Sequence, residues 1–143
     1  MNVMWGLVVV LLSLVAWGGQ ALSWFAPGLA ERWNVTEAEA DVEPAFWADG
    51  RGEALWDTCT SWTMVVAGVL LIVDVNAWAY FGLVGGGMYL YFGGRVIFTR
   101  VAMERRGLRI GAPQNVRLGY IFGAVWAAMA VVTIVAAIVS LES

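Results

Sequence analysis

Residues 55–99 read LWDTCTSWTMVVAGVLLIVDVNAWAYFGLVGGGMYLYFGGRVIFT, a run that is apolar on both sides of one short polar interruption, Asp74-Val75-Asn76. A single helix of this length would reach about 68 Å, roughly twice what a bilayer core requires. Two antiparallel helices joined by a tight turn fit a membrane better. We therefore expect one span at about residues 55–73 and the next at about 77–99.

Two further apolar segments flank this run, at about residues 3–25 and 118–141. The first lacks the Lys or Arg residues that begin a cleavable signal peptide, so we expect a retained helix. Of the 143 residues, 61% are hydrophobic and 13% are charged, which is more apolar surface than a water-soluble chain of this size can bury. The sequence therefore predicts an all-α integral membrane protein, a four-helix bundle of four transmembrane helices that forms a single transmembrane domain over residues 1–143.

The two long segments between the predicted spans carry opposite charge. The acidic loop, residues 26–54, holds seven acids and two arginines, whereas the basic loop, residues 100–117, holds five arginines and one acid. Four crossings put both loops at one face of the membrane, together with all eight arginines of the chain. Because positive residues near the ends of spans favour the cytoplasm, we expect both loops inside and both termini outside (N-out/C-out), in a cell membrane of the prokaryotic inner-membrane type.

The arginines of the basic loop have two candidate partners. They can contact anionic lipid headgroups, or they can dock on the acidic loop at the same face. The sequence leaves both open for five residues: Arg100, Arg105, Arg106, Arg109 and Arg117. The expected partners of the protein are the lipid bilayer with its anionic headgroups and either further copies of the chain or a larger membrane complex. No nucleic-acid partner is expected.

Arg95 is a charge placed about one turn inside the end of the third predicted span. Such a side chain either reaches back to the headgroups or finds a partner. If the second and third spans pair about Val75, Asp57 comes to a similar depth. We predict that Asp57 pairs with Arg95, or that Glu53 takes this role one turn further out; the alternative is that Arg95 simply extends to the headgroups.

Glycine marks the surfaces where helices are expected to approach closely. Gly82 with Gly86, and Gly119 with Gly123, are GxxxG pairs in the third and fourth spans, and Ala127 continues the second series. In lipid, small residues at this spacing allow backbone contact between helices. The stripes either close the bundle within one chain or form an interface between copies of it.

The usual catalytic residue types are scarce. Histidine and lysine are absent, and Cys59 is the only cysteine, which excludes an internal disulfide, a Cys/His dyad and thiolate metal sites. We expect no catalytic residue, no metal and no cofactor. Trp17 and Trp126 lie deep in predicted spans, where a stacked pigment or quinone is the alternative to an ordinary packing role.

Three classes of function remain. The first is a small non-enzymatic structural or accessory subunit that acts through helix packing and its cytoplasmic loops. The second is an oligomeric channel or transporter, for which the polar residues at mid-membrane are Ser13, Thr60, Thr63, Tyr89, Tyr91 and Thr133. The third is an interfacial enzyme that uses Asp57, Glu53 and Arg95 on a lipid substrate.

Overall fold

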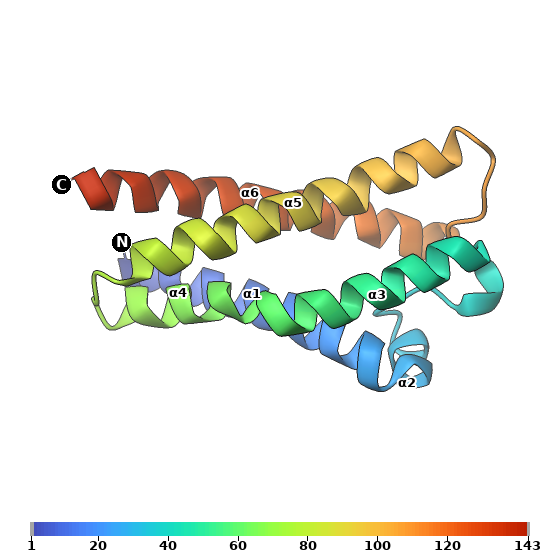
Figure 1. Cartoon of the computed structure of the whole chain (residues 1–143), viewed down its shortest axis with the longest axis horizontal. Coiled ribbons are helices and arrows are strands. Elements are labelled where there is room, and N and C mark those ends of the chain that lie inside the picture. The colour runs from blue at the N-terminus through green and yellow to red at the C-terminus, as the bar shows by residue number, and fades with distance from the viewer. Residues whose placement is uncertain (1, 143) are drawn as a thin grey trace.

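The computed structural model describes residues 2–142. Within them every regular element is a helix and no strand occurs, which confirms the predicted all-α class (Figure 1). The helices are α1 (Asn2–Phe25), α2 (Pro27–Arg32), α3 (Pro44–Thr60), α4 (Trp62–Ile72), α5 (Trp78–Glu104) and α6 (Pro113–Glu142), with one 3₁₀ turn, η1 (Glu39–Asp41).

Three helical stretches are long and apolar enough to cross a membrane: Val3–Phe25, Pro44–Ile72 and Pro113–Glu142. The second combines α3 and α4, which are separated only by a turn at Ser61. The helix α5, which contains the third predicted span, is not among them. Its many glycines and its tyrosines lower its mean hydropathy, although it is 27 residues long. Three stretches of helix with the length and hydropathy of membrane spans are therefore confirmed, and a fourth crossing by α5 stays a prediction.

Helical structure extends further into the polar segments than the predicted spans do. α3 begins at Pro44, eleven residues before the predicted span, and α6 begins at Pro113, five residues early. Proline suits the first turn of a helix because its fixed φ is already helical and its missing N–H is not needed there. α5 likewise continues to Glu104. The connections that remain are short.

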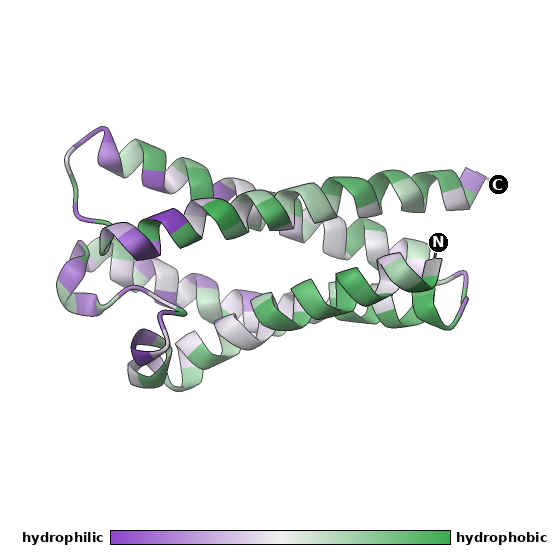
Figure 2. Cartoon of the chain, turned by 180° about the vertical axis from the view of Figure 1, so that it is seen from behind, coloured by the Kyte–Doolittle hydropathy of each residue, from purple (hydrophilic) through white to green (hydrophobic). Residues whose placement is uncertain are grey.

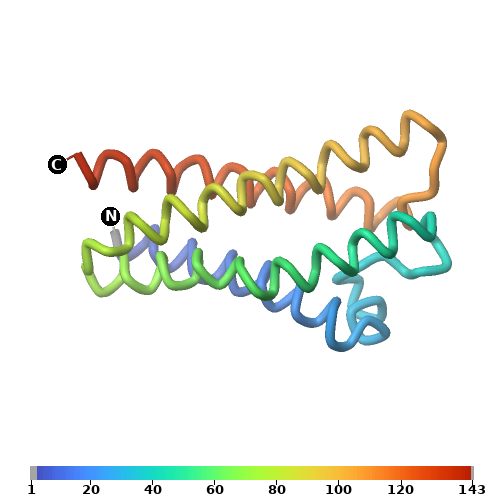
Figure 3. Tube along the Cα trace, in the orientation of Figure 1, coloured from blue at the N-terminus to red at the C-terminus, as the bar shows by residue number. Residues whose placement is uncertain are grey.

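The helices form two antiparallel pairs. α1 packs along α4 and α3, and α5 packs along α6 (Figures 1 and 3). The turn at residues 73–77 joins α4 to α5, and Asp74 adopts the left-handed conformation there, with φ at 57°. This turn lies at the same end of the bundle as both termini, whereas the acidic and basic loops lie at the other end. Figure 2 shows that hydrophilic residues gather at the loop end, where they alternate with hydrophobic ones, and that the helices toward the termini are mainly hydrophobic.

The glycines of the predicted stripes lie against helices of the same chain. A Cβ added to Gly86 would stand 2.6 Å from Ile134 Cγ1, and one added to Gly82 would touch Thr133. Gly123 packs on α5, where its added Cβ would stand 3.1 Å from the carbonyl oxygen of Gly93. α5 and α6 thus approach each other almost backbone to backbone.

Two further close approaches were not predicted. Gly6 of α1 and Gly68 of α4 face each other, and a Cβ added to either would stand 3.0 Å from the other's carbonyl oxygen. Gly85 of α5 lies against the backbone of Met64 in α4. Close helix contacts therefore join α1 to α4, α4 to α5 and α5 to α6.

Side chains fill the middle of the bundle tightly. The buried residues packed together there are Val9, Ala16, Met64, Ala67, Tyr89, Met129 and Ala130. A second cluster packs the end nearer the termini with Leu71, Trp78, Ala79 and Ala137. Close packing at this end leaves the open space of the molecule at the end that carries the loops.

Candidate functional site

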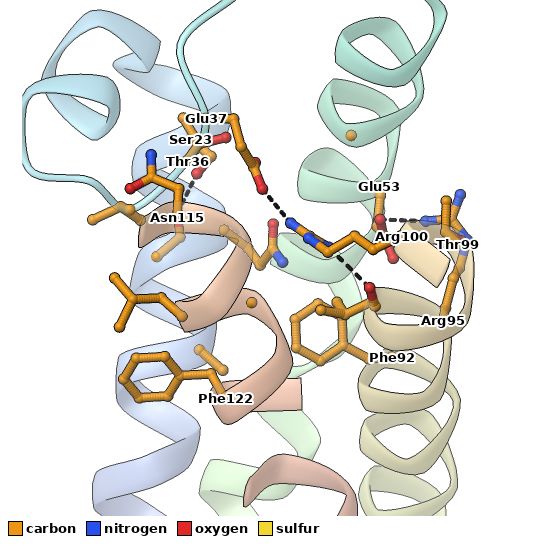
Figure 4. A pocket seen from close by; sticks show the side chains of 18 of the residues that line it. Ser23, Thr36, Glu37, Glu53, Phe92, Arg95, Thr99, Arg100, Asn115 and Phe122 are labelled. Carbon is orange, nitrogen blue, oxygen red and sulfur yellow. Dashed lines mark hydrogen bonds and ion pairs between the residues drawn. The ribbon is translucent and has the colours of Figure 1, made fainter. Parts of the chain in front are cut away.

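A cavity of about 590 Å³ lies between the two helix pairs, beneath the loops. Its walls come from α1, α3, α5, α6 and the segment at residues 33–37 (Figure 4). Ligand pockets in proteins commonly measure about 300–1,000 Å³, so the space suits a small molecule. It is the main candidate for a functional site in residues 2–142.

Charged groups at the wall of the cavity balance one another. Three are arginines, Arg51, Arg95 and Arg100, and three are acids. The acids are Glu37, Asp49 and Glu53. The formal charges of the wall therefore sum to zero. The two loops at this end of the molecule carry opposite charge, and neither sign predominates at the cavity.

Arg95 joins α5 to α3 through two acids. Its guanidinium forms ion pairs with Glu53 and with Asp49, one turn further out (Figure 4 shows the Glu53 pair). Within the described residues no ion pair joins Arg95 to Asp57. Of the two predicted partners, Glu53 pairs with Arg95 and Asp57 does not. Asp49 adds a contact that the sequence analysis did not predict. The cause is depth, because Arg95 points outward to the turns of α3 nearer the loops.

Asp57 lies one turn deeper on α3, beside a pocket of its own. Its Oδ2 atom is buried and accepts no hydrogen bond. The small pocket next to it is also lined by Ser61, Tyr89 and Gln20. It shares Gln20 with the large cavity, so the two spaces adjoin.

Arg100 holds the segment at residues 33–37 in place from the opposite wall. It forms an ion pair with Glu37, and the two side chains are only 11% and 13% exposed. A second nitrogen of the guanidinium donates a hydrogen bond of 3.0 Å to the Val96 carbonyl, and the group lies 5.5 Å from the centre of the Phe46 ring. Protein groups thus contact the guanidinium from several sides, although its buried Nε atom donates no hydrogen bond.

Arg51 is held by α1. It donates a hydrogen bond to the carbonyl oxygen of Ser23, and its guanidinium lies 4.9 Å from the centre of a ring of Trp24. This contact is a cation–π interaction, in which the cation meets the negative face of an aromatic ring. The Arg51 guanidinium therefore also contacts protein groups.

The acidic and basic loops contact each other directly. Val42 and Ile110 form an isolated antiparallel bridge, and the Glu43 amide donates a 2.9 Å hydrogen bond to the Arg109 carbonyl. The Arg109 side chain lies 3.5 Å from Glu43 and donates a hydrogen bond to the Ala40 carbonyl. The loops thereby form one cap over the bundle.

The remaining arginines of the basic loop face outward. Arg105, Arg106 and Arg117 are exposed, and none of them has an ion pair in the described part of the chain. The two alternatives for the basic loop, docking on the acidic loop and contact with lipid headgroups, thus concern different residues. Arg100 and Arg109 contact the acidic segment, while these three stay available for lipid headgroups.

Aromatic rings line the deeper part of the cavity. Phe122 and Trp126 of α6 stack with ring centres 5.2 Å apart and planes 28° apart, and Phe92 of α5 lies 5.2 Å from Trp126. Trp33, Phe46 and Trp47 line the part nearer the loops. The cavity therefore has an apolar, ring-lined interior and a charged rim.

Gln20 brings an amide to this apolar interior. It lies on α1, five residues before the helix ends at Phe25, and contributes to both pockets. Within residues 2–142 its side chain has no hydrogen-bond partner from the protein. A polar side chain inside a membrane helix is costly and commonly marks a functional position.

The sequence analysis missed Gln20, Asp49 and Phe92. A signal existed for the first two: Gln20 is a polar exception in an apolar span, and Asp49, Glu53 and Asp57 recur at the four-residue spacing that puts side chains on one helix face. In the described residues no group of three or more acids, cysteines or histidines gathers as a metal site would. Comparison with family models, curated proteins and solved structures finds no match to this chain.

Proposed function

We propose that this protein is a non-enzymatic accessory protein of a cell membrane that crosses the bilayer four times and holds a small membrane-soluble molecule beneath its two loops. The cavity carries the proposal. It has the volume of a ligand site, an apolar interior and a polar rim, which is the usual composition of small-molecule pockets.

Four crossings, with both loops in the cytoplasm and both termini outside, belong to the proposal. α5 supplies the fourth crossing because it packs between α4 and α6 and is 27 residues long. Its glycines Gly82, Gly85 and Gly93 face those neighbours rather than lipid. The gathering of arginines at the loop end supports the orientation in a prokaryotic inner membrane.

Transport is the alternative function, and the structure offers one argument for it and one against it. Ser13, Tyr89 and Thr133 are buried in the bundle, as a polar path would require. Tyr91 is 71% exposed, however, and the middle of the bundle is filled by apolar side chains such as Met64 and Met129. A binding site open at one end agrees better with this packing than a channel does.

Catalysis has weaker support. An interfacial enzyme would need Glu53 and Arg95 free to act, yet they are engaged with each other. Asp57 lies apart in the smaller pocket. Assembly into a homo-oligomer or a larger complex remains part of the proposal, and it would use a surface other than the Gly82, Gly86 and Gly123 contacts already covered within the chain.

Native purification with a matched pair of variants tests the proposal. Gly50 and Gly52 lie on α3, and a Cβ at either position meets nothing within 4 Å, but only Gly50 lines the cavity. Gly50→Trp places an indole at the mouth of the cavity, while Gly52→Trp makes the same change outside it. Small molecules that stay with the protein in mild detergent are identified by mass spectrometry.

The expected result is a molecule enriched over bulk lipid at about one per chain. It should be retained by Gly52→Trp and lost from Gly50→Trp. If no molecule is enriched in the wild-type protein, or if both variants retain it equally, the cavity is not the binding site.

A further inference from the structure

We infer that the ligand of this cavity is an uncharged lipid-soluble molecule with a flat ring bearing carbonyl or hydroxyl oxygens, the chemistry of quinones and quinols, and that Gln20 binds its ring oxygen. The inference rests on the proposed function and adds the class of ligand to it. Three properties of the wall lead to it: its charge balance, its rings and the unpartnered amide of Gln20 beside those rings.

The charge balance argues against an ionic ligand. Each arginine of the wall already contacts protein groups: Arg95 two acids, Arg100 Glu37, and Arg51 the Ser23 carbonyl and the Trp24 ring. One donor, the buried Nε atom of Arg100, has no hydrogen-bond partner. A charged headgroup would compete with the ion pairs of Arg95 and Arg100, and displacing one acid from such a pair would leave a partly buried charge unpaired, which is strongly destabilising. An uncharged ligand leaves them all intact.

The rings favour a flat ligand. Phe122 and Trp126 present stacked planes in the deep part of the cavity, with Phe92 tilted against them. Aromatic side chains gain energy from offset stacking or edge contact with another ring, beyond the burial of area alone. Six aromatic residues line the cavity in all: Trp33, Phe46, Trp47, Phe92, Phe122 and Trp126.

Gln20 supplies the polar contact. Its amide offers two donor hydrogens and one acceptor oxygen, which suit both a ring carbonyl and a ring hydroxyl. It sits about 7.5 Å inside the end of α1, below the charged rim and beside the pocket that contains Asp57. In an apolar interior a hydrogen bond to the ligand relieves an amide that the protein leaves without a partner.

Calorimetric titration of the full chain in lipid nanodiscs tests the inference. The probes are a benzoquinone with one isoprene unit, the anion dodecanoate and the cation dodecyltrimethylammonium, with empty nanodiscs subtracted. Gln20→Leu is compared with Gln114→Leu, which alters an exposed glutamine outside the cavity. Leucine is well tolerated in a membrane helix, so the variant is expected to fold.

The quinone should bind saturably and the two ions should not. Gln20→Leu should weaken quinone binding about tenfold, the equivalent of one net hydrogen bond at about 1.4 kcal/mol per factor of ten, whereas Gln114→Leu should bind like the wild type. Equal affinity of the two variants overturns the role of Gln20. Saturable binding of an ion in place of the quinone overturns the ligand class but leaves a binding cavity, whereas a cavity that takes up no probe and no native molecule overturns the proposed function as well.

Discussion

Replacing Gly93 by alanine should push α5 and α6 apart. The added Cβ would stand 2.6 Å from the carbonyl oxygen of Gly123, 3.0 Å from the backbone nitrogen of Ala127 and 3.1 Å from its Cβ. Two of these neighbours are backbone atoms, which cannot rotate away as a side chain would. The neighbouring Gly94 offers a control, because a Cβ there meets nothing within 4 Å.

The size of the effect follows from this geometry. Ordinary contact begins at 3.4 Å, so the helices must separate by about 0.8 Å at the crossing, a strain of the kind that costs roughly 1–3 kcal/mol in packed interiors. Alanine also favours the helix over glycine by up to about 1 kcal/mol. That gain is common to both positions. Gly93→Ala should therefore be about 1–3 kcal/mol less stable than Gly94→Ala.

Reversible unfolding in mixed detergent micelles measures the difference. Helical circular dichroism is followed while sodium dodecyl sulfate is added, and the two variants are compared with the wild type. Gly94→Ala should equal or exceed the wild type in stability. If Gly93→Ala is as stable as Gly94→Ala, the two helices do not approach as closely as described, and the account of α5 as a helix packed by its glycines is refuted.

Two further predictions concern the loops and the orientation. A double-mutant cycle with Glu37→Gln and Arg100→Gln should give a coupling of about 1–3 kcal/mol in the same unfolding assay, because both partners are largely buried; a coupling near zero would remove this ion pair from the account of the cap. A fluorescent reporter that folds only in the cytoplasm should stay dark when fused at the C-terminus and should fluoresce when inserted after Gly107, and the reverse pattern would overturn the proposed orientation.

The helical fold, with apolar helices long enough to span a membrane, could be predicted because it depends on hydropathy along the chain. The stretch at residues 3–25 is apolar almost throughout, and no neighbour is needed to recognise it. The ends of the helices were harder to place. Pro44 and Pro113 begin their helices inside polar segments. Hydropathy does not mark the start of a helix there, so the start depends on backbone geometry alone.

The sequence predicted the contacts of the site only to within one turn of helix. Depth from the turn pointed to Asp57 or Glu53 as partners of Arg95, and the direction of a long side chain selected Glu53 and Asp49. Likewise, the opposite charge of the two loops favoured their contact, but the bridge between Val42 and Ile110 could not be read from charge. Ion pairs are sensitive to a single turn of helix, about 5.4 Å.

The order of residues by itself determined that this chain is helical, suited to a membrane, and segregated into an arginine-bearing end and an apolar end, since each of these depends on local composition and spacing. Only the tertiary structure decided that the bundle is packed shut toward the termini and open beneath the loops. A cavity exists where helices diverge, and its wall joins residues as distant in sequence as Gln20 and Trp126. Divergence is set by which small residues bring the helices into contact elsewhere, and no single segment of the chain contains that information.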